Sequence, residues 1–142
     1  MNCIFCDIIT GNIPAHIVLE DDISLAFLDN RPLFPGHCLL VPKEHCDVLA
    51  DLPAGMVGPL FQNVQLLSRA MEAGLGAEGS FVAVNNRISQ SVPHLHVHVV
   101  PRRKKDGLKG FFWPRSPYKN NEAAADVQHQ LKSVINALRE NT

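Results

Sequence analysis

The segment PHLHVHVV, residues 93–100, places three histidines at every second position and an apolar residue after each one. Successive side chains of a β-strand point to opposite faces, and alternate residues lie about 6.6 Å apart on the same face. The pattern therefore predicts that His94, His96 and His98 share one face of a strand. The apolar residues between them are expected to anchor the other face in the core.

Three aligned imidazoles are compatible with three interpretations. They could be incidental and solvated, although histidine is not a favoured strand residue. They could bind one metal ion through neutral ring nitrogens. They could also be catalytic, because a neutral imidazole can act as a nucleophile while a neighbouring imidazolium stabilises charge on phosphate oxygens or protonates a leaving group.

The elements that must position these histidines can be predicted from hydrophobic periodicity and turn residues. A short helical turn is expected within the first sixteen residues, an amphipathic helix over 59–73 with Pro59 in its first turn, and a final helix over 122–139. The expected strands cover residues 17–20, 23–29, 37–42, 80–84 and 95–100. Five short strands, mostly consecutive, with helices at the start, middle and end indicate an α+β domain around an antiparallel sheet.

Composition and charge exclude several classes of partner. The 142 residues suit one domain, 46% of them are hydrophobic, and the net charge is −1, so neither a disordered chain nor a nucleic-acid binder is expected. The N-terminus lacks a basic region and Asp7 interrupts its apolar run, so neither an export signal nor a membrane span is expected. The prediction is a cytoplasmic protein with reduced cysteines that acts on small molecules or pairs with itself.

Several stretches of the chain resemble the histidine triad (HIT) superfamily of nucleotide hydrolases and transferases. PHLHVHVV is similar to its His-φ-His-φ-His-φ-φ motif, where φ is apolar, and Gln90-Ser91-Val92 stands where the family carries a phosphate-contacting Gln-Ser/Thr-Val. IFCDIITGNIPAHIVLEDDISLAFLD resembles the Hint branch, and NRPLFPGHCLLVP resembles the fragile-histidine-triad branch. The likeness covers about residues 3–103 and places the chain between the two branches, as a bacterial-type member.

The resemblance implies a HIT-like fold, with a five-stranded antiparallel sheet that is extended by homodimerisation. It implies a single domain over 1–142, with a core at about 3–103 and a C-terminal interface segment and helix at about 104–140. The apolar side chains near Trp113 fit such an interface, and we expect Trp113 at or near the dimer contact. The chain has Val-Pro-Arg at 100–102 where Hint proteins carry Gly-Gly-Arg, which leaves the substrate open.

The resemblance also implies a role for each histidine. His96 matches the nucleophile that attacks the α-phosphorus of a bound nucleotide and forms a covalent nucleotidyl-histidine, which water resolves. His98 would hold a phosphate oxygen or assist the leaving group, and His94 would fix the tautomer and orientation of the nucleophile. His37 matches a supporting histidine of the neighbouring strand, with an ordinary histidine at a strand start as the alternative.

A nucleotide site is implied around the triad. Asp29 matches a residue that accepts both ribose hydroxyls, and its position at a strand end equally suits a local hydrogen bond. The other matching positions are apolar residues that enclose the base, which would otherwise be core, and uncharged donors for phosphate oxygens. The first group is Phe5, Ile8, Ile13 and Phe27, and the second is Asn85, Gln90 and Ser91.

A C-x₂-C pair, Cys3 and Cys6, lies near the N-terminus. Only two residues precede it, which argues against a thioredoxin-like redox pair, since that pair follows a strand. Zinc commonly takes four cysteine and histidine ligands, and the resemblance to zinc-binding bacterial members implies the set Cys3, Cys6, His45 and His94. Two ordinary buried thiols are the alternative. Cys38 is expected in the core, and Cys46 has no assigned function.

The prediction is a nucleotide-binding hydrolase or nucleotidyl transferase that acts at the α-phosphorus of a purine nucleoside phosphate derivative. The substrate is a dinucleoside polyphosphate, which Mg²⁺ could accompany, or a nucleoside phosphoramidate or acyl adenylate. Structural zinc and no organic cofactor are expected. The basic run 102–105 is interpreted as a solvated loop, except that Arg102 could attract polyphosphate. Two alternatives stay open: a metalloenzyme with a catalytic ion on the three histidines, and a non-catalytic nucleotide-binding adaptor protein.

Overall fold

The computed structural model describes residues 2–109 and 115–141. The chain divides into two compact units, the first ending at Asp106 and the second beginning at Gly107. The expectation of one domain over 1–142 stays a prediction. The interface predicted at Trp113 lies outside the described residues.

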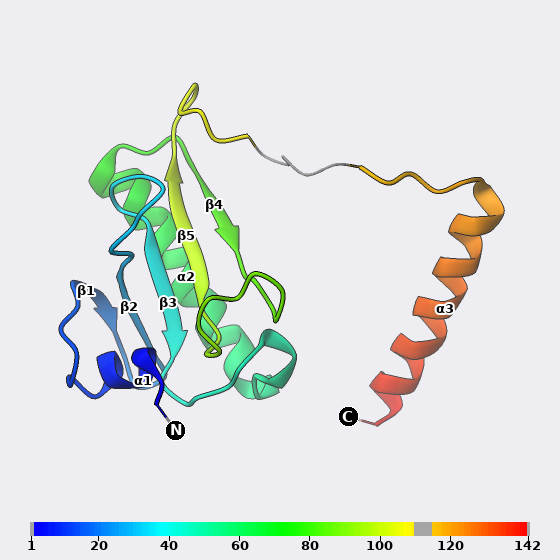
Figure 1. The fold of residues 1–142 in the computed structure, drawn as a ribbon, viewed down its shortest axis with the longest axis horizontal. Coiled ribbons are helices and arrows are strands. Elements are labelled where there is room, and N and C mark those ends of the chain that lie inside the picture. The colour runs from blue at the N-terminus through cyan, green and yellow to red at the C-terminus, as the bar shows by residue number, and fades with distance from the viewer. Residues whose placement is uncertain (1, 110–114, 142) are drawn as a thin grey trace. The chain divides into compact units, whose positions relative to one another are not determined.

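A five-stranded antiparallel sheet forms the centre of the first unit (Figure 1). Its strands are β1 (Ile17–Glu20), β2 (Ser24–Leu28), β3 (Cys38–Pro42), β4 (Gly79–Ala83) and β5 (Val97–Arg102). Their order across the sheet is β1-β2-β3-β5-β4, and every neighbouring pair is antiparallel. The predicted α+β class and antiparallel sheet are confirmed.

Two apolar layers cover the two faces of this sheet. The long helix α2 (Ala54–Leu75) crosses one face (Figure 1) and packs the predicted apolar stripe against it. The members of this stripe are Leu60, Val64, Leu67 and Met71. The short helix α1 (Ile4–Ile9) packs Phe5 and Ile8 against the other face. Side chains that alternate along a strand therefore point either toward α2 or toward α1.

The helix α2 begins earlier than its sequence predicts. It starts at Ala54, after the 3₁₀ turn η1 (Leu49–Asp51), so Pro59 lies inside the helix and its placement in the first turn is wrong. A proline there removes the N–H that would donate one turn back, and its ring crowds the carbonyl four residues before it. The buried apolar stripe that follows stabilises the helix in spite of both costs. The helix ends at Leu75 because Gly76 adopts a left-handed conformation, with φ +67°.

The strand that carries the histidines also differs from its predicted bounds. It was expected over 95–100, but β5 runs over Val97–Arg102, so only His98 of the three histidines lies within it. The backbone just before it bonds elsewhere, because the Leu95 N–H donates to the Cys46 carbonyl at 2.8 Å. The predicted alternation nevertheless continues through this segment, since Leu95, Val97 and Val99 are fully buried in the α2 layer.

The second unit contains the helix α3 (Asn121–Glu140), close to the predicted 122–139. The side chain of Asn120 caps it by accepting the Ala123 N–H at 2.8 Å. None of the described residues of α3 is buried, and its apolar side chains are exposed, namely Leu131, Val134, Ile135 and Leu138. Among the described residues, no helix is long and apolar enough to cross a membrane.

Candidate active site and metal site

A cavity of about 680 Å³ lies on the α1 side of the sheet and collects most of the predicted nucleotide-site residues. One part of its lining is apolar and contains Phe5, Ile8, Ile13 and Phe27. The polar part contains Asp29, Ser91, His96 and His98. The sequence did not single out His16 and Arg31, which also line it. The cavity thus offers an apolar surface for a base beside hydrogen-bonding groups for a sugar and a phosphate.

The ring of His96 is held with one nitrogen available. Its Nδ1 lies 2.8 Å from the backbone carbonyl oxygen of His94. A carbonyl oxygen only accepts, so Nδ1 must carry the hydrogen and donate it, which leaves a lone pair on Nε2 of the neutral ring. Phe5 packs against the edge of this ring, with centroids 5.1 Å apart, and fixes its orientation. The arrangement suits a nucleophile.

His98 and His37 form a ring-to-ring hydrogen bond that fixes two further tautomers. The Leu33 N–H donates to His37 Nδ1 at 3.1 Å, so the neutral ring of His37 carries its hydrogen on Nε2. That nitrogen lies 3.0 Å from His98 Nδ1 and donates to it. His98 therefore carries its own hydrogen on Nε2, which makes this nitrogen a donor on the ring that lines the cavity.

Burial keeps these two rings neutral. The pKa of His98 is lowered to about 4, mainly by burial and in smaller part by the neighbouring rings of His96 and His37, while Asp29 opposes the shift. Burial also lowers the pKa of His37, again against the charge of Asp29. At neutral pH the tautomers of both rings are thus set by their hydrogen-bond partners.

Asp29 makes the local hydrogen bond that its position at a strand end suggested, while its contact with ribose stays a prediction. Its Oδ1 accepts the Arg31 N–H at 2.9 Å, which is a local turn bond, and its Oδ2 lies 3.7 Å from His37 Nε2. The residue also lines the cavity. Ligand atoms of Asp29, His37 and His98 lie within 4.8 Å of one another. A cation on His37 Nε2 would require a hydrogen on Nδ1, which faces the Leu33 N–H, so this group is better described as a hydrogen-bond relay.

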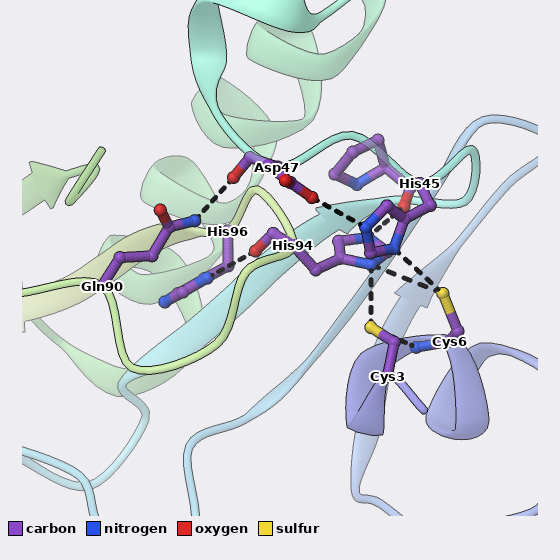
Figure 2. Close-up of polar contacts among 8 residues, drawn as sticks. Cys3, Cys6, His45, Asp47, Gln90, His94 and His96 are labelled. Carbon is purple, nitrogen blue, oxygen red and sulfur yellow. Dashed lines mark hydrogen bonds and ion pairs between the residues drawn. The ribbon is translucent and has the colours of Figure 1, made fainter. Parts of the chain in front are cut away.

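The four predicted metal ligands lie together, and we refer to Cys3, Cys6, His45 and His94 as the Cys–His cluster (Figure 2). The Nδ1 of His94 lies 3.4 Å from Cys3 Sγ and 3.6 Å from Cys6 Sγ, and the Nδ1 of His45 lies 3.3 Å from Cys6 Sγ. Tetrahedral zinc with ordinary bond lengths places its sulfur and nitrogen ligands about 3.5 Å apart. The spacing of the cluster therefore fits one zinc ion.

The outer nitrogens of both histidines support this fit. His94 Nε2 donates to the carbonyl oxygen of Pro42 at 2.9 Å, and His45 Nε2 donates to Asp47 Oδ1 at 2.9 Å. Both lone pairs are thereby directed from Nδ1 toward the thiols, the arrangement that metal-binding histidines favour. Burial, and then the neighbouring Cys3, raise the pKa of Cys6 to about 11, so a cation must displace its proton to bind.

The geometry does not support a catalytic ion shared by all three triad histidines. His94 directs Nδ1 to the thiols, and Nδ1 of His96 is bonded to a backbone carbonyl. Among the described residues, two groups bring three or more ligand atoms within 4.8 Å of one another, and neither contains the whole triad. The metalloenzyme alternative therefore has no structural basis here.

The Gln90 side chain, in the loop before the triad, makes two hydrogen bonds within the protein. Gln90 donates from Nε2 to the Asp47 carbonyl at 2.6 Å and accepts the Arg87 N–H at 2.8 Å. Neither Gln90 nor Asn85 is among the described residues that line the cavity, so their phosphate contacts stay predictions. Sequence reasoning missed Asp47 as the partner of His45, although a carboxylate two residues after a histidine ligand is a signal of this kind.

The side chain of Arg102, which could attract polyphosphate, is engaged within the protein. Its guanidinium pairs with Asp106 through two hydrogen bonds of 2.6 and 3.0 Å. Arg102 also lies at the far end of β5, opposite Gly79 and about 13 Å along the strand from His98. Cys38 is buried, as expected, and Cys46 is half-buried.

The fold, the Cys–His cluster and the neighbouring group of His37, His96 and His98 define a histidine-triad protein. The family model described as the HIT domain matches residues 10–105. An adenylylsulfatase of Arabidopsis thaliana is 37% identical over 137 residues, covering 94% of this chain and 68% of that protein. An adenosine 5′-monophosphoramidase of Schizosaccharomyces pombe is 36% identical, covering 95% of this chain and 99% of that protein.

Comparison with solved structures also points to the histidine triad family. A zinc-bound histidine triad family protein of Mycobacterium smegmatis superposes with a TM-score of 0.73 at 37% identity, covering 94% of this chain and 98% of that chain. The chain belongs to the HIT family and is a hydrolase of that family. The resemblance inferred from its motifs is confirmed.

Proposed function

We propose that the protein cleaves a bond at the α-phosphorus of a purine nucleoside phosphate derivative, through a covalent intermediate on His96. The free lone pair on His96 Nε2 is the observation that carries this proposal, because the ring lines the cavity and its other nitrogen is bonded to a carbonyl. The base would lie against Phe5, Ile8, Ile13 and Phe27, and the ribose hydroxyls would bond to Asp29.

The first chemical step would join His96 Nε2 to phosphorus while the bond to the leaving group breaks. The positive charge that develops on His96 would be stabilised by the His94 carbonyl, which accepts the Nδ1 hydrogen. An amine leaving group needs a proton, and His98, which lines the cavity, would give it from Nε2 as an imidazolium. The ring would have to take a second proton at Nδ1, in place of the hydrogen bond from His37, when the negatively charged phosphate binds beside it.

The second step would release the product by hydrolysis. A water molecule would attack phosphorus, form a P–O bond and break the P–N bond to His96. Its proton would pass to the lone pair that the first step left on His98 Nε2, which regenerates the imidazolium. Ser91 would hold a phosphate oxygen throughout, and its place in the cavity lining supports this assignment.

The substrate is proposed to be an adenylate with a small leaving group. One relative is named an adenylylsulfatase and another an adenosine 5′-monophosphoramidase. A dinucleoside polyphosphate with Mg²⁺ is the second candidate, but Arg102 is paired with Asp106 and lies away from the cavity, which weakens it. The non-catalytic adaptor on this fold is the remaining alternative.

The Cys–His cluster is proposed to hold structural zinc, which when bound would supply a rigid link between the N-terminus and the segment before β5. A cytoplasmic homodimer is proposed as well. The exposed apolar side chains of α3 are consistent with an interface, and sedimentation at micromolar concentration that finds only monomer would contradict it.

The decisive experiment is to trap the intermediate. Protein is mixed with adenosine 5′-phosphoramidate or with diadenosine polyphosphate, denatured at alkaline pH because the P–N bond is labile in acid, and digested. The peptide carrying residues 93–100 is then examined by mass spectrometry. An adenylyl adduct on His96 is expected with at least one substrate. Turnover without any adduct, or turnover that His96→Ala preserves, would overturn the mechanism. AMP binding without turnover of either compound would favour the adaptor.

A further inference from the structure

The loop at 85–90, which joins β4 to the triad segment, has a strained backbone. Arg87 has φ +67° and Ser89 has φ +60°, the left-handed region that residues other than glycine rarely adopt. Such conformations persist only when the surrounding structure holds them in place. Ser91 follows directly and lines the proposed nucleotide cavity, so the loop conformation determines where its hydroxyl lies.

Two hydrogen bonds hold this loop to a segment that is distant in sequence. The Gln90 side chain donates to the Asp47 carbonyl at 2.6 Å, across 43 residues. The Leu49 N–H donates to Asn86 Oδ1 at 2.8 Å, across 37 residues. Gln90 also accepts the Arg87 N–H, so the amide that reaches Asp47 supports one of the two strained residues directly.

The same residue, Asp47, reaches the Cys–His cluster from its other side. Its carboxylate oxygen Oδ1 accepts the His45 Nε2–H at 2.9 Å, while its backbone carbonyl accepts from Gln90 (Figure 2). Figure 2 shows the resulting continuous path from Cys6 through His45 and Asp47 to Gln90. The side chain of Asp47 is more than half exposed, so the bond to His45 is the described contact that restrains it.

We propose that Asp47 is a positioning residue that links the Cys–His cluster to the phosphate end of the active site. Its carboxylate orients His45 for a zinc ion, and the bond in turn fixes the backbone of Asp47. The fixed carbonyl then holds Gln90, the strained loop and Ser91. The inference rests on the proposed function for its kinetic consequence only, because zinc affinity and loop mobility are measurable without turnover.

The test compares four variants of the zinc-loaded protein. Asp47→Ala removes the bond to His45 and keeps the backbone carbonyl, whereas Asp47→Asn retains an acceptor oxygen. Gln90→Ala breaks the other end of the path. Asp51→Ala is the matched control, because it removes a nearby exposed carboxylate that makes no side-chain hydrogen bond to His45 or to the loop among the described residues.

Three readouts are measured for each variant: zinc affinity by chelator competition, amide hydrogen exchange over residues 86–91, and steady-state kinetics with adenosine 5′-phosphoramidate. Asp47→Ala is expected to lower zinc affinity roughly 10- to 100-fold, as loss of a ligand's supporting partner does, and to accelerate exchange in the loop. Gln90→Ala is expected to accelerate exchange equally and to leave zinc affinity unchanged. Asp47→Asn is expected to restore most of both properties.

The kinetic expectation separates positioning from chemistry. Asp47→Ala and Gln90→Ala should each raise KM about fivefold, the effect of about one hydrogen bond, with little change in kcat, because the bond from His96 to the His94 carbonyl is unaffected. Loop exchange in Asp47→Ala equal to that in Asp51→Ala would overturn the inference, even if zinc affinity fell. A protein without turnover would refute the proposed function, while exchange and zinc affinity would still decide this link.

Discussion

The two histidine groups of this protein meet at one short segment, yet they present opposite chemistry. In the Cys–His cluster, His45 and His94 use Nε2 to donate to protein oxygens and direct Nδ1 lone pairs at two thiols. In the second group, which we call the imidazole cluster (His37, His96 and His98), His96 donates from Nδ1 and keeps its lone pair on Nε2.

The difference lies in the partner of one ring nitrogen. His94 and His96 are two residues apart, but the Pro42 carbonyl lies at Nε2 of the first ring and the His94 carbonyl at Nδ1 of the second. Since a neutral imidazole has one donor and one acceptor nitrogen, each carbonyl decides which nitrogen remains available. The same residue type thus becomes a metal ligand in one position and a nucleophile in the next.

Replacing the nucleophile should give the largest effect. His96→Ala is expected to lower kcat with adenosine 5′-phosphoramidate at least about 10⁴-fold, since loss of a covalent nucleophile has costs of this order or more. AMP binding by calorimetry should change little. His129→Ala, an exposed histidine on α3, is the control. A comparable loss for both variants would remove the distinction between the imidazole cluster and any other histidine.

Removing the proposed proton donor should have a smaller effect. His98→Ala is expected to lower kcat roughly 10²- to 10⁴-fold for an amine leaving group, the usual contribution of general acid–base catalysis. The loss should shrink for a leaving group that needs no proton, such as sulfate. Rates measured with adenylyl sulfate and adenosine 5′-phosphoramidate side by side test this. Equal losses with both substrates would contradict the donor assignment.

Breaking the Cys–His cluster should change stability more than chemistry. With zinc at about 100 times its dissociation constant, binding to the folded state alone raises the free energy of unfolding by about 2.7 kcal/mol. This corresponds to a rise in Tm of about 5–10 °C at this chain length. Cys6→Ser should abolish most of this rise in a calorimetric scan. Cys46→Ser, which changes a thiol outside the cluster, should retain it. If the Tm of the native protein is the same with and without zinc, a structural metal is excluded.

The lowered pKa values of the imidazole cluster predict how stability varies with pH. The pKa of His98 is about 4 in the folded protein, because of burial, against 6.5 for the ordinary ring. As pH falls from 6.5 to 4, His98 binds a proton in the unfolded state but stays neutral in the folded state. The free energy of unfolding therefore falls across this window, and above pH 6.5 this contribution to stability is complete. His37 shifts in the same direction.

Urea titrations at pH 7.0, 5.5 and 4.5 measure this effect, and His98→Gln should flatten the pH dependence relative to the native protein. Ring titration by NMR gives the direct check. A His98 resonance that titrates near pH 6.5 would show that the ring is hydrated rather than buried.

Several elements followed from local sequence patterns. The C-terminal end of α2 and the strands β1 to β4 matched within a few residues, because their apolar periodicity coincides with burial in the final structure. Pro59 and the start of β5 did not match. In both places a tertiary contact outweighs the local signal. The apolar side chains that follow Pro59 pack against the sheet and stabilise the helix around it. The Leu95 N–H donates to the Cys46 carbonyl, so it does not pair with a neighbouring strand.

The residues of the candidate site were predicted unevenly for a similar reason. The resemblance to HIT proteins supplied the Cys–His cluster and the imidazole cluster, and the structure brings the members of each together. Asp47 was missed, because its bonds to His45 and Gln90 depend on how two distant loops meet.

The sequence by itself determined which chemical groups this protein has: alternating histidines, a cysteine pair and the apolar residues that fold a sheet beneath them. Only the tertiary structure decided which ring nitrogen each histidine offers and what holds the loop beside it. The physical reason is that the tautomer of a neutral imidazole is set by the acceptor or donor that faces it. In this protein those partners are mostly backbone groups, and the sequence of side chains does not encode their positions directly.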